Sequence, residues 1–370
     1  MGIRQPGVED LVAVRILVTG NMGYVGPVVV EHLRESRSAG TELTGLDTGF
    51  FAHCLTGTSQ LPELRLDCQW FGDVRHPPAG SLEGVDSVVH LAGVSNDPIG
   101  TTYEEATFDV NHRATVELAR TAKDAGARSF VFASSCSVYG LAEEGLRTEE
   151  SETGPLTAYA KSKLRAEEGL AELADDSFAV TSLRFATACG MSDRLRLDLV
   201  LNDFVAGAHA FREITLLSDG TPWRPLIHVR DMARAIDWAV DRPAGNGGAF
   251  LALNTGSDEW NYQIRQLAEA VAEIVPGVEV SVREDAAPDA RSYKVGFGRF
   301  RELAPEHQPR VGLGEAIEDL AAGLERMQFA DPDFRNSELV RLRVLDDLRE
   351  AGLVNGALEW APAGEPVARG

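Results

Sequence analysis

The sequence predicts an α/β fold, with a Rossmann-like, doubly wound parallel sheet and a smaller C-terminal lobe. Short apolar runs rich in β-branched residues alternate with helix-like stretches over the first half of the chain, which is typical of a parallel sheet covered by helices on both faces. Three glycines spaced three apart, Gly20, Gly23 and Gly26, follow the first run. Small polar or acidic residues follow several later runs, at the strand ends where such sheets bind ligands.

The elements of the first domain follow from the apolar periodicity of the sequence. We expect strands at 14–19, 42–47, near 70–72, and at 85–91, 128–134 and 179–185. We expect helices at 24–36, 103–125 and 157–174. Right-handed crossovers would join these elements into one domain over 13–187, preceded by a loose leader at 1–12.

The alternation loosens after about residue 188, which predicts a second, smaller substrate-binding lobe. We expect this lobe to consist of 188–221 and 259–330, with 222–258 returning to the first domain. The periodicity predicts a strand-turn-helix at 226–240, a strand at 250–254 and an amphipathic helix at 261–274. The remaining segment, 331–370, is expected to form a charged surface helix at 336–350 and a frayed tail at 361–370.

The composition limits the classes of partner and compartment. The 370 residues are 44% hydrophobic and 25% charged, which is ordinary for a globular enzyme. The net charge of −22 disfavours nucleic acid or an anionic membrane as a partner. The four cysteines show no CxxC spacing, no set of residues has metal-ligand spacing, and no apolar run approaches the roughly 20 residues of a membrane helix. We therefore expect a cytoplasmic protein with reduced thiols.

The glycine turn and Asp47 together predict a dinucleotide site. The glycines let backbone amides approach a bound group, and the helix that starts directly afterwards favours a pyrophosphate at its N-terminus. An ordinary glycine turn would show the same three residues. Asp47 follows the next strand, about twenty residues later, where a carboxylate accepts hydrogen bonds from an adenosine ribose and repels a 2′-phosphate. We therefore expect NAD, and not NADP, as the cofactor of domain 13–187.

Tyr159 and Lys163 form the second signal. On a helix they lie one turn apart on the same face, and the ammonium is expected to lower the pKa of the phenol. A phenolate there would be a base for a sugar hydroxyl, and Ser135, at the end of the preceding strand, would hold the same oxygen. Taken singly, a surface tyrosine with a solvated lysine, or a serine that ends a strand, is the commoner explanation.

Together these motifs resemble the extended short-chain dehydrogenase/reductase family, specifically its nucleotide-sugar epimerases and dehydratases, over about 14–300. The resemblance implies catalytic roles for Ser135, Tyr159 and Lys163. It places the cofactor along Gly20, Met22, Gly23, Tyr24, Val25, Gly26, Asp47, Asp73, Val74, Leu91, Ala92, Gly93, Tyr159 and Lys163. Substrate contacts are expected at Ser95, Asn96, Ser135, Cys136, Thr187, Asn202, Arg224 and Arg291. For Asn96, in Asn-Asp-Pro, a turn-forming role is equally open.

Departures from the family pattern narrow the reaction. The 4,6-dehydratases carry an Asp-Glu pair where this chain has Cys136 and Ser137, and the sugar-acid decarboxylases usually carry a glutamate at the place of Ser137. The small uncharged residues at these positions resemble those of a 4-epimerase. Other departures are Thr187, Pro225, Gly296 and Gly298, which replace residues common in relatives.

We therefore expect an NAD-dependent epimerase of a nucleotide-diphosphate sugar, acting at C4 through a transient 4-keto sugar. One alternative is 3,5-epimerisation or ring isomerisation, with Cys136 or Cys189 recruited. Another is a non-catalytic NAD-binding sensor, although a sensor need not keep Ser135, Tyr159 and Lys163 together. The resemblance also implies a homodimer, because the helices that correspond to 103–125 and 157–174 pair across a two-fold axis in relatives.

Overall fold

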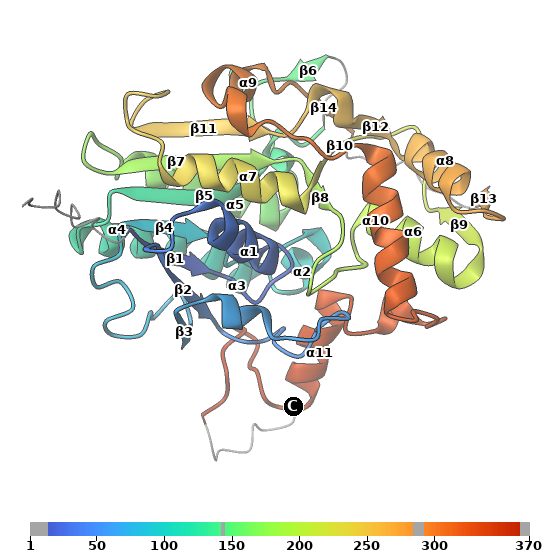
Figure 1. The fold of residues 1–370 in the computed structure, drawn as a ribbon, viewed down its shortest axis with the longest axis horizontal. Helices are drawn as coiled ribbons and strands as arrows, with labels where there is room; N and C mark the ends of the chain where they lie inside the picture. Colours follow the sequence, from blue (N-terminus) through green and yellow to red (C-terminus); the bar gives the residue numbers. More distant parts are fainter. Residues whose placement is uncertain (1–13, 142–144, 284–291, 363–370) are drawn as a thin grey trace, which may run out of the picture.

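A seven-stranded parallel sheet forms the centre of the computed structural model, which describes residues 14–141, 145–283 and 292–362 (Figure 1). Its order is β3-β2-β1-β4-β5-β7-β11. The strands are β1 (Arg15–Thr19), β2 (Glu42–Asp47), β3 (Cys68–Phe71), β4 (Ser87–His90), β5 (Ser129–Ser135), β7 (Ala179–Phe185) and β11 (Phe250–Thr255). The predicted α/β fold is confirmed. The order of strands reverses between β1 and β4, which creates a crevice beyond their carboxyl ends.

Helices cover both faces of the sheet because its strands are apolar on both sides. In β1, Ile16 and Val18 join one hydrophobic cluster, whereas Leu17 between them joins another. Successive side chains of a strand point to opposite faces, so a continuous apolar run fits a sheet buried on both faces. The first face carries α1 (Gly26–Ser36) and α7 (Val229–Val240), and the second carries α4 (Thr115–Asp124) and α5 (Ala158–Ala171).

The helix expected over 103–125 is interrupted in the structure. It divides into α3 (Glu104–Phe108), a π-helical segment (Asp109–Ala114) and α4, and it is preceded by α2 (Asp97–Thr102). Within the π-helical segment, the side chain of Asn111 accepts a hydrogen bond from the Val94 amide and donates one to the Val94 carbonyl, both at 2.8 Å. These bonds hold the chain as it leaves β4 and give the interruption a structural role.

Two boundaries in the second half differ from expectation. The strand at 226 belongs to β10 (Trp223–His228), which pairs with β8 (Thr187–Cys189) and β12 (Asn261–Gln263) in a separate three-stranded sheet. Only α7 and β11 therefore return to the large sheet. The helix expected from 261 begins at Ile264 as α8 (Ile264–Ile274), because the preceding residues pair with β10 and the side chains of Gln263 and Gln266 form a capping box.

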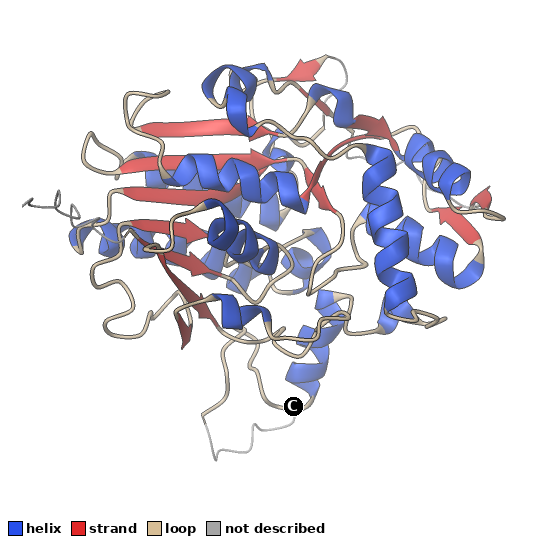
Figure 2. Cartoon of the chain, viewed as in Figure 1, coloured by secondary structure: helices blue, strands red, loops and turns tan. Residues whose placement is uncertain are grey.

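The smaller part of the molecule lies beyond the carboxyl ends of the sheet (Figures 1 and 2). Its helices are α6 (Val200–Phe211), α8 and α10 (Leu313–Arg326), with α9 (Gly298–Leu303) beside β11. Two short sheets pair β9 (Glu213–Leu216) with β13 (Glu279–Val282) and β6 (Leu146–Arg147) with β14 (Lys294–Val295).

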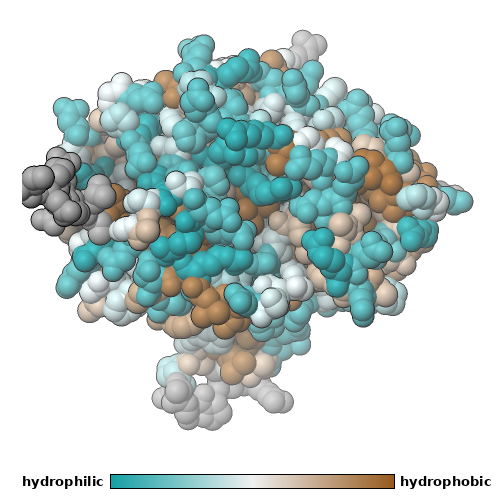
Figure 3. All heavy atoms as spheres, in the orientation of Figure 1, coloured by the Kyte–Doolittle hydropathy of each residue, from teal (hydrophilic) through white to brown (hydrophobic). Residues whose placement is uncertain are grey.

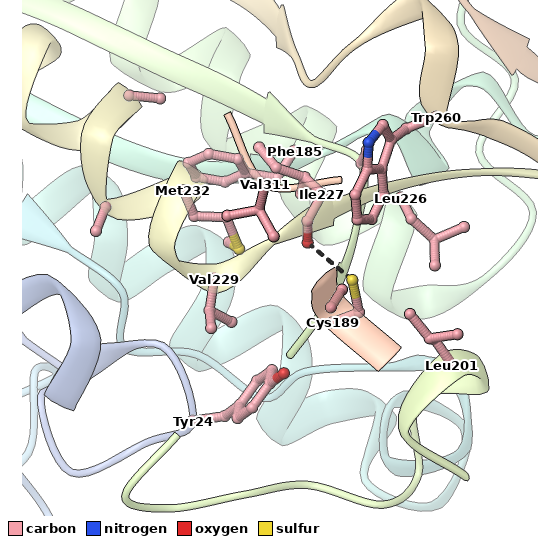
Figure 4. Packing of buried hydrophobic residues seen from close by; sticks show 14 of the residues in the cluster. Tyr24, Phe185, Cys189, Leu201, Leu226, Ile227, Val229, Met232, Trp260 and Val311 are labelled. Carbon is pink, nitrogen blue, oxygen red and sulfur yellow. Dashed lines mark hydrogen bonds between the residues drawn. The ribbon is translucent and has the colours of Figure 1, made fainter. Parts of the chain in front are cut away.

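One continuous apolar core joins the two parts. Figure 4 shows Tyr24, at the start of α1, in the same cluster as Cys189, Leu201 of α6 and Ile227 of β10. Because these side chains are almost completely buried, the smaller part is fixed against the carboxyl ends of the strands.

The C-terminal segment differs most from expectation. α11 (Arg341–Glu350) and the residues up to 362 pack against the loop after β2 and against α2 and α3, although we expected a surface helix and tail. Leu345, Val354 and Leu358 are each at most 3% exposed in a cluster with Phe50 and Tyr103. Charged residues between these apolar positions conceal this buried face in the sequence. The predicted leader at 1–12 and most of the predicted tail lie outside the described residues.

Hydrophilic side chains cover most of the face shown in Figure 3, consistent with the strongly acidic composition. None of the described helices is both long enough and apolar enough to cross a bilayer.

Candidate active site

A cavity of about 1110 Å³ opens where the order of the strands reverses. It brings together the ends of β1, β2, β4 and β5, one face of α5 and the start of α6. Of the residues predicted to contact the cofactor, those that line it are Gly20, Gly23, Tyr24, Val25, Gly26, Asp47, Asp73, Val74, Leu91, Ala92, Gly93, Tyr159 and Lys163.

The glycine loop presents main-chain groups to this cavity. Gly20 has a φ of +72°, and a Cβ atom there would lie 2.5 Å from the Ala92 nitrogen, so only glycine fits between β1 and β4. α1 begins directly after the loop, and Val25, at its N-cap, makes no side-chain capping bond. The first amides of α1 are therefore without a side-chain cap beside the cavity, as a pyrophosphate requires.

Asp47 is held in one orientation by the backbone. Its two carboxylate oxygens accept hydrogen bonds from the amides of Met22 (3.0 Å) and Gly49 (2.8 Å). Burial raises the pKa of the carboxyl group, while these two hydrogen bonds oppose the rise. Met22 itself does not line the cavity, and its amide positions Asp47. The glycine loop and Asp47 together fit the phosphates and a ribose of NAD.

Asp73, which lines the cavity, forms an ion pair with an arginine. Arg75 forms an ion pair with it at 2.6 Å and also donates to the carbonyl oxygens of Ala357 and Leu358, both at 2.7 Å. The C-terminal segment is thereby attached to Asp73, one of the residues that were expected to contact the cofactor.

Ser135, Tyr159 and Lys163 converge on the cavity as predicted, but their electrostatics differ from expectation. Desolvation raises the pKa of Tyr159 to about 12, although the nearby Ser135 side chain acts to lower it. Lys163 donates to the Ala133 carbonyl at 2.8 Å, and burial lowers the pKa of its amine to about 7. The low tyrosine pKa that we expected is therefore not found for these protein groups alone, because desolvation outweighs the groups that lower it, Ser135 and Arg196.

Five of the predicted substrate residues line the cavity: Ser95, Asn96, Ser135, Thr187 and Arg224. Ser95 accepts a hydrogen bond from Arg196 at 2.7 Å. The Asn96 side chain caps α2 by accepting from the Ile99 amide, and it donates to Asp198 at 2.7 Å. The turn-forming role of Asn96 is thus realised, at the wall of the cavity.

Asn202 does not line the cavity. Its side chain is completely buried, where its oxygen accepts from the Gly190 amide and its nitrogen donates to Tyr24 and to the Arg196 carbonyl. The amide oxygen and the amide nitrogen of Asn202 therefore both bond to other parts of the protein. Residues 199 and 200, at the start of α6, line the cavity in its place.

Cys136 is also outside the cavity. Its thiol donates to the Arg184 carbonyl at 3.0 Å, and burial raises its pKa well above the ordinary value. Cys189 is likewise buried, and its thiol donates a hydrogen bond to the Ile227 carbonyl oxygen (Figure 4). Neither thiol lines the cavity, where the cysteine-assisted alternative requires an acid or base. Arg291 lies outside the described residues.

Sequence reasoning missed a charged stretch of the wall. Arg196 and Asp198 form a buried ion pair at 2.7 Å, and both line the cavity, as do Arg335 and Arg341. Charged and apolar residues alternate from 194 to 198 directly before an apolar helix, and this unusual alternation was an available signal. For Arg335 and Arg341 the sequence around them gave no such signal.

Comparisons with known proteins agree with this geometry. Residues 16–252 match the model of the NAD dependent epimerase/dehydratase family. A UDP-glucose 4-epimerase of Streptomyces lividans is 30% identical over 272 residues, 70% of this chain and 80% of that protein. UDP-glucuronic acid decarboxylase 1 of Xenopus tropicalis is 25% identical over 82% of this chain and 70% of its own length. The solved structure of MoeE5 in complex with UDP-glucose and NAD has a TM-score of 0.71 and 25% identity, covering 85% of this chain and 99% of MoeE5.

Proposed function

The chain belongs to the NAD-dependent epimerase/dehydratase family, as a nucleotide-sugar member of the extended short-chain dehydrogenase/reductases, and from that premise we propose that it inverts C4 of a nucleotide-diphosphate sugar through a transient 4-keto intermediate. The observation that carries the proposal is the meeting of Ser135, Tyr159 and Lys163 beside the glycine loop and Asp47 in one cavity. NAD, when bound, supplies the hydride acceptor and donor, together with a positively charged ring.

Tyr159 is the proposed base. As a phenolate it removes the proton of the sugar 4-hydroxyl while the C4 hydrogen leaves as hydride, and it returns the proton when hydride is delivered to the other face. A phenol with a pKa of about 12 needs added positive charge to act near neutral pH. The oxidised nicotinamide ring would supply that charge when the cofactor is bound.

Ser135 and Lys163 have supporting roles in this proposal. The Ser135 side chain is close enough to lower the pKa of Tyr159, and it would orient the same sugar oxygen. Lys163 donates one hydrogen bond to the Ala133 carbonyl near the end of β5. Its other donors would bind a ribose hydroxyl and face the Tyr159 phenolate. The two-step redox route suits this chemistry because a carbinol C–H bond is too weakly acidic for direct proton exchange.

The residues beside Ser135 argue against elimination and decarboxylation. Cys136 points away from the cavity, and Ser137, which lines it, carries no carboxylate. An elimination at C5 and C6 needs an acid and a base at these positions, and neither residue supplies a carboxylate. The local chemistry therefore favours epimerisation over the other reactions of the family.

The sugar nucleotide would lie between the sheet and the lobe formed by 188–221 and 259–330. Arg224 on β10 and the uncapped start of α6, at Leu199, line this side of the cavity. A guanidinium and the N-terminus of a twelve-residue helix are suitable partners for a diphosphate. This assignment replaces the earlier one to Asn202.

The direct test is a turnover screen. The purified protein is denatured, the released cofactor is identified by mass spectrometry, and the intact protein is incubated with UDP-, GDP-, dTDP- and CDP-sugars. We expect NAD in the released fraction and interconversion of one pair of C4 epimers without net formation of NADH. Dehydrated or decarboxylated products, or stoichiometric NADH, would contradict the proposal.

A further inference from the structure

Arg341 is a buried arginine in the cavity wall that pairs with none of the carboxylates in the described part of the chain. It is 2% exposed and forms no ion pair within the part of the chain that the structure describes. Its guanidinium donates to the carbonyl oxygens of Glu338, Arg194 and Leu195, and its Nε atom is buried without any hydrogen-bond partner. Burial accordingly lowers the pKa of the group to about 10. A guanidinium has five N–H donors, so two of them, the Nε–H and one Nη1–H, make no hydrogen bond to the described residues.

Arg242 is a useful comparison because it is buried in the same manner. It too is surrounded by carbonyl groups, and burial lowers its pKa to about 10. Its Nε atom, however, donates to Thr181 at 2.7 Å, its other donors are fully used, and it does not line the cavity. All N–H donors of Arg242 therefore have hydrogen-bond acceptors within the protein, whereas Arg341, in the cavity wall, has donors without an acceptor.

The position of Arg341 in its helix also favours an anion. It is the first residue of α11, and no acidic side chain occurs in the first turn of that helix. The N-terminus of a helix is the positive end of its dipole, so a cation there is unfavourable unless an anion lies nearby. Val340, the N-cap, lines the same cavity. Two positive features thus converge on one region of the wall.

We propose that Arg341 binds a phosphate group of a nucleotide held in this cavity, so that the C-terminal segment is part of the nucleotide site. Its guanidinium lies 5.1 Å from the ring centroid of Phe51, in the loop that follows Asp47, and Leu345 and Leu358 extend the same wall. The phosphate comes either from the dinucleotide cofactor or from the nucleotide sugar. The inference rests on the proposed function only in requiring that a nucleotide occupies the cavity.

The test compares Arg341→Met with the matched control Arg242→Met in the full-length protein. Protein freed of nucleotide is titrated calorimetrically with NAD and, separately, with UDP, and the unfolding transition of each variant is recorded without ligand. Both substitutions should lower stability, because both leave backbone carbonyls unpaired. Only Arg341→Met should weaken nucleotide binding, by roughly tenfold or more.

Weaker binding of NAD alone identifies the cofactor as the source of the phosphate, and weaker binding of UDP alone identifies the substrate side. Unchanged affinity for both ligands in folded Arg341→Met overturns the proposal. If that variant does not fold, Arg341→Gln, which keeps donors for the carbonyls and removes the charge, decides by the same criteria. Binding is measured without turnover, so an inactive enzyme with normal affinities would count against the epimerase proposal and not against this one.

Discussion

The Lys163 Nζ atom lies 5.8 Å from the ring centroid of Tyr159 and donates its hydrogen bond to Ala133 at the end of β5. The two side chains share one face of α5, one helical turn apart, and both reach the cavity. Their spacing in the sequence predicts this proximity, but the surrounding protein determines their protonation. Burial acts against the ammonium of Lys163 and against the phenolate of Tyr159, so ligand charge must complete the site.

Burial of Lys163 has a measurable effect on stability. Its pKa is about 7 in the folded protein and about 10.5 in the unfolded chain. Between these values the unfolded chain holds more protons, so the free energy of unfolding rises with pH. In urea titrations of nucleotide-free protein at pH 7, 8 and 9, wild type should gain stability relative to Lys163→Met. Lys161→Met, which alters an exposed lysine of α5, is the control, and an equal gain relative to both variants would contradict the assignment.

Tyr159→Phe should retain NAD and lose activity. General-base catalysis contributes about 10²–10⁴-fold, so the loss in kcat should be at least of that order. NAD retention is measured by absorbance of the purified variant. The control is Tyr262→Phe, which removes a phenol in the smaller part, beside Trp260 and away from the cavity. Wild-type turnover by Tyr159→Phe would remove the redox mechanism.

Asp47 should set the preference for NAD over NADP. Its carboxylate, oriented by Met22 and Gly49, repels a 2′-phosphate, so NAD should bind at least tenfold better, about 1.4 kcal/mol. Asp47→Ala should narrow this ratio in titrations with both dinucleotides. Asp67→Ala removes a carboxylate near β2 that does not line the cavity, and it should leave the ratio unchanged. A preference of the unmutated protein for NADP would refute the assignment.

A homodimer remains a prediction from the resemblance. α4 and α5 lie together on one face of the sheet (Figure 1), where the corresponding helices of relatives pair about a two-fold axis. Light scattering at micromolar concentration should therefore give twice the chain mass of 39.9 kDa. A mass of 39.9 kDa under these conditions would exclude the dimer.

The parts of the fold that depend on local pattern were predictable. β1 and the glycine turn could be predicted because a buried strand requires apolar residues and the positive φ of residue 20 favours glycine. Asn202 was misplaced because the start of α6 decides which side chains face the cavity. The helix begins at Val200, and this register turns residue 202 toward Tyr24.

The C-terminal segment was missed for a different reason. Its buried positions, such as Leu345 and Leu358, are separated by charged residues, and they are buried only because Phe50 and Tyr103 meet them from distant parts of the chain. Such pairing leaves no local periodicity. The same applies to Arg341, whose significance comes from the carbonyls and the cavity around it.

Transient oxidation at C4 can be followed by isotope labelling of the substrate. Substrate deuterated at C4 should give an epimer that keeps its deuterium, because the hydrogen is transferred as hydride and returned without exchange with water. Unlabelled substrate turned over in D₂O should acquire no deuterium at C3, C4 or C5. Loss of the C4 label, or deuterium incorporated at C3 or C5, would contradict a hydride transfer from and back to C4.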